Sequence, residues 1–139
     1  MKNKIIPIIF VFIFTFIACA LTFLVIRKKN YIDISFATEI VLKYHYNDIK
    51  IDKVITDKND IKILKENFKG VAYKDNPSCG FSMDISITFT DGENNIIFCP
   101  ACDSCSKARV GDTKKYINIK NRELVETIIG KYGMIFPCV

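Results

Sequence analysis

Cysteines are the residues of this chain whose type and spacing could do chemistry. The sequence of 139 residues contains six, and three of them follow one another as Cys99-x-x-Cys102-x-x-Cys105. Thiols at this density form disulfides in an oxidising compartment, whereas in a reducing one they bind metals or exchange disulfides. The chemistry of this chain therefore depends on the side of a membrane that its cysteines face.

Disulfides are the expected chemistry in an exported domain, where each bridge stabilises the fold by about 2–4 kcal/mol, mainly by restricting the unfolded chain. We expect Thr90 and Asn95 to lie opposite each other in a hairpin. If the flanking strands continue side by side, Cys79 comes close to Cys105, which makes this pair the first expected bridge. The full set of disulfide candidates is Cys79, Cys99, Cys102, Cys105 and Cys138.

Cys138 lies one residue before the end of the sequence. A bridge from Cys138 to Cys99 or Cys102 would keep the end of the chain from fraying. Because five cysteines cannot all pair within one domain, the remaining thiol would be free or available to another chain. The sequence leaves the connectivity open.

A redox dithiol is a second possibility. Cys99-Pro100-Ala101-Cys102 resembles the active-site turn of glutaredoxins and related disulfide oxidoreductases, in which a helix N-terminus lowers the pKa of the first thiol. In the thioredoxin fold this motif comes early and is followed by a helix and further strands, whereas only 37 residues follow Cys102 here. A thiol–disulfide oxidoreductase is thus the enzymatic alternative, and we otherwise expect no enzyme.

A metal or cluster site is the third possibility. Cys99, Cys102 and Cys105 would supply three thiolates, with Cys79 or Cys138 as a fourth ligand. Four such ligands suit a tetrahedral zinc ion or an iron–sulfur cluster. This interpretation leads if the domain is cytoplasmic, whereas the exported interpretation requires no cofactor.

Other catalytic constellations are not expected. His45 is the sole histidine, and it lies between two tyrosines on a predicted strand, which favours a sheet-surface position over a catalytic base. The glycines are isolated and do not form a phosphate-binding loop. We therefore predict no catalytic residue.

The N-terminal apolar run predicts a membrane anchor. Residues 5–26 are uncharged, and a helix that rises about 1.5 Å per residue crosses the roughly 30 Å hydrocarbon core with this length. Two processing alternatives exist. Ala18-Cys19-Ala20 has the form of a signal-peptidase site, and the segment ending at Cys19 resembles a bacterial lipobox, which would place a lipid on Cys19. We expect the anchor to be retained, because cleavage would leave an apolar new terminus.

Basic residues flank the anchor on both sides. A short tail of residues 1–4 carries two lysines, and Arg27, Lys28 and Lys29 follow the anchor. A strict count of positive charges favours a cytoplasmic domain, but a short basic tail before a long apolar run is typical of a signal anchor that exports the downstream domain. We expect a single-pass membrane protein with an extracytoplasmic C-terminal domain.

The net positive charge is confined to these flanks. The formal net charge of +5 comes from the basic residues beside the anchor, because residues 30–139 contain equal numbers of acidic and basic side chains. We expect Arg27, Lys28 and Lys29 to contact anionic lipid headgroups. Nucleic acid is not an expected partner, because phosphate binding normally needs a net basic face. The lysine- and isoleucine-rich, arginine-poor composition is typical of bacterial proteins.

Hydrophobic periodicity predicts an α+β domain. The expected organisation is a tail at 1–4, the anchor at 5–26, a basic juxtamembrane tether at 27–38 and a single domain at 39–139. Alternating patterns predict five strands, at 40–46, 49–55, 83–90, 95–98 and 116–119. A helix is expected between a cap at Asn59 or Asp60 and Gly70, and another over 122–132 between Asn121 and Gly133. The order ββα-βββα predicts an antiparallel sheet with helices on one face.

Together these observations predict a small membrane-anchored binding or accessory domain held by disulfides. A thiol-based redox or metal-binding protein centred on Cys99, Cys102 and Cys105 is the alternative. The sequence does not identify a protein or small-molecule partner.

Overall fold

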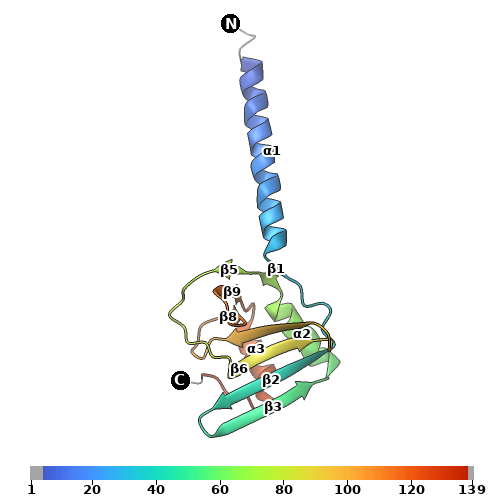
Figure 1. Cartoon of the computed structure of the whole chain (residues 1–139), viewed down its shortest axis with the longest axis vertical. Coiled ribbons are helices and arrows are strands. Elements are labelled where there is room, and N and C mark those ends of the chain that lie inside the picture. The colour runs from blue at the N-terminus through green and yellow to red at the C-terminus, as the bar shows by residue number, and fades with distance from the viewer. Residues whose placement is uncertain (1–4, 138–139) are drawn as a thin grey trace. The chain divides into compact units, whose positions relative to one another are not determined.

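The computed structural model describes residues 5–137 of the chain. Two compact units are present, Met1–Tyr31 and Ile32–Val139. The first contains helix α1 (Ile5–Lys29), and the second contains the sheet and two further helices (Figure 1).

Helix α1 is long and apolar enough to cross a membrane. The hydroxyl of Thr15 donates to the carbonyls of Val11 and Phe12, as expected for a polar side chain in an apolar helix. Its last turn carries Arg27, Lys28 and Lys29. A secretory signal sequence has the same length and composition, so processing decides between a retained anchor and a removed signal.

The second unit alternates short strands with two helices. Its elements are β1 (Tyr31–Ile32, at the boundary with the first unit), β2 (Glu39–Tyr46), β3 (Ile49–Ile55), α2 (Lys58–Phe68), β4 (Gly70–Val71), β5 (Tyr73–Lys74), β6 (Ile85–Thr90), β7 (Asn95–Pro100), β8 (Lys107–Val110), β9 (Lys115–Asn118) and α3 (Arg122–Gly130).

Seven of these strands form one antiparallel sheet in the order β3-β2-β6-β7-β8-β9-β5. Helices α2 and α3 lie on the same face of it (Figure 1). The α+β class with helices on one face is therefore as predicted. The strand number and order are not: the prediction of five strands missed β8 and β5, which extend the sheet beyond β7 on the side away from β2.

The core lies between the sheet and the two helices. In β2 the side chains of Ile40, Leu42 and Tyr44 are buried, while the residues between them are only half-buried, which is the alternation expected of a strand with one covered face. Phe68 from α2 packs against Phe98 of β7, with ring centroids 5.2 Å apart. Such aromatic contacts fix α2 on the sheet.

Both ends of α2 differ from the prediction. Asp57, and not Asn59 or Asp60, caps α2, because its carboxylate accepts a hydrogen bond from the Asp60 amide. Asp60 instead lies within the helix, and its side chain is buried. Gly70 is not a left-handed terminator, since the helix ends at an extended Lys69.

The predicted boundaries of α3 hold at its start and fail at its end. Asn121 caps the helix as predicted, with its side-chain oxygen accepting from the Leu124 amide. Gly133 has a φ of +98°, but the helix ends earlier, at Gly130. The sequence pattern predicts Leu124 in the core, yet it is 38% exposed, because it lies at the edge of the α3 face that buries Val125, Ile128 and Ile129.

Strand boundaries also shift. β6 begins at Ile85, two residues later than predicted, and β7 continues through Cys99 to Pro100. β9 is one residue earlier than predicted. Ile34 and Ala37, inside the segment predicted as a tether, are buried in the core.

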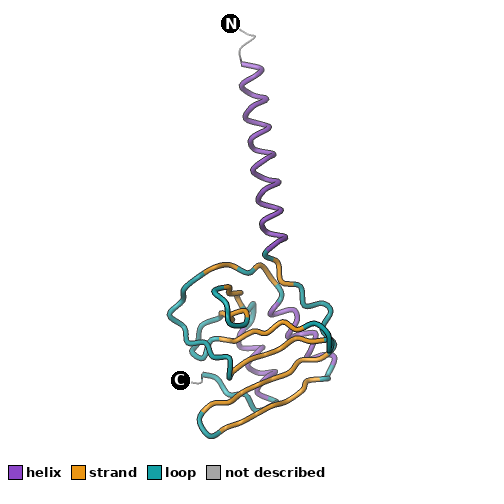
Figure 2. Tube along the Cα trace, in the orientation of Figure 1, coloured by secondary structure: helices purple, strands orange, loops and turns teal. Residues whose placement is uncertain are grey.

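The segment 75–84 connects β5 to β6 without helix or strand (Figure 2). It lies against the sheet face that the helices leave open. Phe81 packs against Tyr116 of β9 with centroids 5.3 Å apart, and Met83 contacts Cys99 of β7. Cys79 lies in this segment, which brings it to the end of the β7–β8 hairpin.

Candidate functional site

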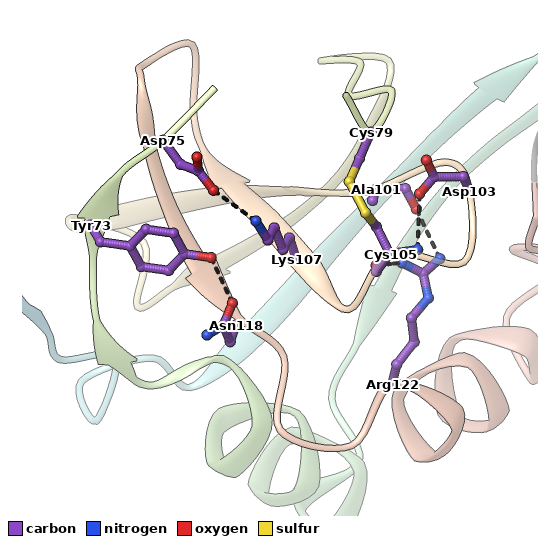
Figure 3. The surroundings of a disulfide bond; sticks show 9 residues. All are labelled: Tyr73, Asp75, Cys79, Ala101, Asp103, Cys105, Lys107, Asn118 and Arg122. Atoms are coloured by element: carbon purple, nitrogen blue, oxygen red, sulfur yellow. Dashed lines mark hydrogen bonds and ion pairs between the residues drawn. A yellow bond between two sulfur atoms is a disulfide. The ribbon is translucent and has the colours of Figure 1, made fainter. Parts of the chain in front are cut away.

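The candidate site is the loop of residues 101–106 between β7 and β8, which we call the cysteine loop. A disulfide joins Cys105 in this loop to Cys79 in the segment 75–84, with Cα atoms 6.3 Å apart (Figure 3). The register that sequence reasoning assumed is present, since Thr90 lies opposite Asn95. The first expected bridge is thus the one in the structure.

Backbone hydrogen bonds shape the cysteine loop around this bridge. The amide of Ala101 donates to the carbonyl of Lys107 at 3.0 Å, and the amide of Cys102 donates to that of Gly80 at 2.8 Å. Within the loop, Asp103 Oδ1 accepts from the Cys105 amide at 2.9 Å. The loop is therefore fixed to both neighbouring segments by main-chain contacts as well as by the disulfide.

Arg122, the first residue of α3, holds the cysteine loop from the other side. Its guanidinium donates to the carbonyl of Ala101 at 2.8 Å and to that of Cys105 (Figure 3). Its Nε pairs with Glu126 Oε1 at 2.7 Å, and its side chain is only 9% exposed. A buried guanidinium whose three nitrogens all donate is a structural clamp, because an unpaired one would carry a large desolvation cost.

A second polar contact anchors the neighbouring strands. Lys107 donates to Asp75 Oδ2 at 2.7 Å, and Tyr73 donates its hydroxyl proton to Asn118 Oδ1 at 2.6 Å (Figure 3). The hydrogen bond from Lys107 lowers the pKa of Asp75, and the same contact raises the pKa of Lys107. These residues connect β5, β8 and β9 at the edge of the sheet.

Cys99 does not join the cysteine loop. Its thiol is fully buried on the sheet face away from the helices, and its Sγ lies 3.3 Å from Met83 Sδ. Burial raises the pKa of Cys99, and the guanidinium of Arg109 offsets only part of that rise. A raised thiol pKa opposes the reactivity of a redox nucleophile.

The remaining sequence-predicted cysteines are distributed over the chain. Cys102 is buried in the core beside Gly80, and Cys19 is exposed on α1. Cys138, predicted to hold the tail, lies outside the described residues. His45 pairs with Asp52 of β3 at 2.9 Å on the sheet surface, which is the position expected for it.

Metal-ligating atoms gather at one point of the cysteine loop. Sulfur atoms of Cys79 and Cys105 and a carboxylate oxygen of Asp103 lie within 4.8 Å of one another. These three donors suit a divalent metal only when the disulfide is reduced, because ligation requires thiolates. Among the described residues Cys99 and Cys102 are not part of this group, although sequence reasoning placed them in the metal alternative.

Two hollows lie on the surface of the domain. One, of about 270 Å³, borders the cysteine loop and is lined by Asp103, Ser104, Ser106, Arg122, Glu123, Glu126 and Pro137; we call it the loop hollow. The other, of about 380 Å³, lies against α2 and is lined by Ala37, Thr38, Lys58, Ile61, Lys62, Lys65 and Glu66. The first is lined mainly by acids and hydroxyls, and the second is rich in lysine.

Sequence reasoning missed two buried charged groups. The sequence pattern indicates Arg122 only as the start of a helix. A signal was nevertheless present, because an arginine in a chain that otherwise uses lysine suggests a planar contact with several hydrogen bonds. The same pattern offers Asp60 only as a cap. It is 4% exposed and accepts hydrogen bonds from Lys131 at 2.8 Å and from the Tyr132 hydroxyl at 2.9 Å.

Comparisons with protein families, with curated proteins and with solved structures found no match to this chain.

Proposed function

We propose that this protein is a membrane-anchored, extracytoplasmic binding or accessory domain stabilised by disulfides. The observation that carries the proposal is the Cys79–Cys105 disulfide in a domain that follows an apolar helix long enough to span a membrane. Disulfides persist in exported domains and are reduced in most cytosols. An anchor followed by a disulfide-containing domain therefore favours the outside of the membrane.

The cysteine loop supports a structural role for the disulfide. Arg122 and the loop backbone surround Cys105 with contacts that hold one conformation, and the neighbouring thiol of Cys99 is buried with a raised pKa. Neither feature suits rapid disulfide exchange. We propose no catalytic residue and no resident cofactor, and we assign lipid contact to Arg27, Lys28 and Lys29.

Thiol labelling on intact cells tests this proposal. A membrane-impermeant maleimide that adds mass is applied with and without prior reduction. For an exported domain, Cys79 and Cys105 label from outside after reduction and not before. If these cysteines label only after lysis, and do so without reduction, the domain is cytoplasmic and the proposal is wrong.

A thiol-based metal or redox protein is the second candidate. The observation that favours it is the grouping of the Cys79, Asp103 and Cys105 donor atoms. The reduced full-length protein in detergent is titrated with zinc alone, and Cys79→Ser is compared with Cys102→Ser. Loss of tight zinc binding in Cys79→Ser alone supports a site at this group, whereas loss in Cys102→Ser supports the site predicted from Cys99, Cys102 and Cys105. Binding that neither variant weakens, or no binding, removes this candidate.

A further inference from the structure

The C-terminal tail of the domain lies on the helix-covered face of the sheet. The Tyr44 hydroxyl donates to the carbonyl of Ile135 at 3.0 Å, and the ring of Phe136 packs edge-on against Tyr44 with centroids 6.2 Å apart. Met134 is 2% exposed within the core. The tail is therefore fixed to this face up to the last described residues.

Arg122 brings the tail and the cysteine loop together. Its guanidinium donates to the carbonyl of Ala101, and the ring of Phe136 lies 5.4 Å from the same guanidinium carbon. Ala101 directly precedes Cys102. One side chain thus contacts both the residue before Cys102 and the tail.

The loop hollow also brings the same two segments near each other. Asp103, which directly follows Cys102, lines this hollow together with Pro137. Pro137 is joined by one peptide bond to Cys138. Consecutive Cα atoms are about 3.8 Å apart, and a disulfide joins Cα atoms about 4.4–6.8 Å apart, so a disulfide between Cys138 and this loop requires Pro137 to lie beside the loop.

Cys99 is on the wrong side of the sheet to meet this tail. Its neighbour Phe98 packs against Phe68 on the helix-covered face, and successive strand residues point to opposite faces. Cys99 accordingly contacts Met83 on the open face. Cys105 is already bonded to Cys79, which leaves Cys102 as the cysteine of this region on the side of the tail.

We propose that Cys138 forms a second disulfide with Cys102, which locks the tail onto the cysteine loop. Cys138 lies outside the described residues, and the inference rests on the positions of Phe136 and Pro137. On formation two S–H bonds break and one S–S bond forms. Two protons and two electrons pass to the disulfide of an exported thiol–disulfide oxidase, which becomes a dithiol. The inference depends on the exported location proposed above.

Peptide mapping of the full chain tests this inference. The protein is extracted from membranes in detergent that contains N-ethylmaleimide. It is then denatured while N-ethylmaleimide is still present, and digested with trypsin. Cleavage after Lys74, Lys107 and Lys131 places four cysteines in the peptide 75–107 and Cys138 in the peptide 132–139. Without reduction we expect the two peptides as one linked species that carries a single maleimide, on Cys99. Reduction before alkylation should separate them.

Each other result overturns the inference in a recognisable way. Maleimide on both Cys102 and Cys138, with Cys79 and Cys105 still bonded, removes the second disulfide and leaves the exported location standing. Maleimide on all five cysteines shows a reducing compartment and removes both proposals. A fragment spectrum that links Cys138 to Cys99, or a dimer on a non-reducing gel that is absent from Cys138→Ser, assigns Cys138 another partner.

Two variants sharpen the assignment. Cys138→Ser should add one maleimide to the peptide 75–107, at Cys102. The matched control Cys99→Ser should remove the single maleimide and leave the linked species intact. Because the wild-type map gives the connectivity by itself, the test stands even if Cys138→Ser fails to accumulate.

Discussion

The two ends of α3 are held by different chemistry. At its first residue, Arg122 donates to carbonyls of a loop that a disulfide fixes in place. Just beyond its last turn, Lys131 and Tyr132 both donate to the buried carboxylate of Asp60 on α2. The first attachment depends on the oxidation state of two cysteines, and the second depends on the protonation of a carboxyl and a phenol.

The difference shows two ways of burying a charge in a small domain. Arg122 places a cation against neutral carbonyls and one half-exposed glutamate, whereas Asp60 places an anion against a lysine and a phenol. Both groups have side chains less than a tenth exposed, so each needs its partners to offset desolvation. The disulfide-dependent end should therefore respond to reduction, and the Asp60 end to pH.

The largest expected effect follows removal of the disulfide. The bridge closes a loop with a sequence separation of 26, for which the chain-entropy estimate is about 3.5 kcal/mol at 25 °C. Cys79→Ser/Cys105→Ser should lose about this much free energy of unfolding in urea titration of the detergent-solubilised chain under non-reducing conditions. Cys99→Ser is the matched control and should lose less than about 1.5 kcal/mol, since it exchanges one small buried side chain. Equal losses in the two variants would contradict the structural role of the bridge.

Breaking the Arg122 contact should cost nearly as much. Arg122→Met keeps most of the apolar stem and removes every donor, which leaves two carbonyls and Glu126 without the guanidinium. We expect a loss of about 3 kcal/mol in the same titration. Arg122→Lys should recover only part of it, because an ammonium cannot reproduce the planar fork. Full recovery by lysine would show that charge alone matters at this position.

The Asp60 end should weaken in acid. Hydrogen bonds from Lys131 and Tyr132 lower the pKa of Asp60, so its contribution is present above the ordinary carboxyl range near 4 and is lost as pH falls through the folded value. Asp60→Asn should cost about 2 kcal/mol at pH 7 and progressively less towards about pH 2. Urea midpoints of both proteins across this range test the sign. A difference in stability between wild type and Asp60→Asn that widens in acid would be inconsistent with a lowered pKa of Asp60.

Tyr132 should show the opposite pH dependence. Burial, together with its hydrogen bond to Asp60, raises the pKa of Tyr132 to about 12, so the stabilising neutral phenol is retained below about pH 10 and lost between about 10 and 12. Tyr132→Phe should cost about 1 kcal/mol at pH 7 and should lack this alkaline loss. The difference in phenolate absorbance between wild type and Tyr132→Phe, on titration with base, measures the pKa of Tyr132. A difference signal that appears near pH 10 would remove the explanation.

The smallest effect should come from the surface pair beside the disulfide. Lys107 and Asp75 are each about a third exposed, so solvent screens their interaction. Lys107→Met should change the free energy of unfolding by no more than about 1 kcal/mol, with the effect decreasing further in high salt. A loss comparable to that of Arg122→Met would show that this pair, and not Arg122, holds the cysteine loop.

Long, regular patterns in the sequence predicted most of the fold, and short or irregular segments did not. β2 and β3 extend over eight and seven residues with alternating side chains, so their period was visible. β8 has only four residues, Lys107–Val110, so its alternation of charged and apolar side chains is too short to indicate a strand, and β5 has two residues. Strands this short are defined by their neighbours in the sheet and not by their own residues.

The candidate site was predictable only where local geometry determined it. The Cys79–Cys105 pair was predicted from a hairpin whose register is set by the turn at residues 91–94, although the strand pairing ends at Ile87 and Phe98, before it reaches either cysteine. Arg122 is remote from the cysteine loop in sequence, and Asp60 is separated by 72 residues from Tyr132, which donates to it. No local sequence pattern therefore predicts either contact. The spacing of the cysteines in the sequence groups Cys99 with Cys102. In the structure, however, β7 directs the side chain of Cys99 to the sheet face away from the helices.

The disulfide encloses the β6–β7 hairpin in a covalent ring, because Cys79 precedes β6 and Cys105 follows β7. The tip of that hairpin, at Gly92, Glu93 and Asn94, is exposed. A protease that cuts there would leave a two-chain molecule still joined through sulfur, with the second fragment carrying β7, β8, β9 and α3. Such a nicked protein would release the second fragment only after reduction, so its persistence would depend on redox conditions as much as on proteolysis.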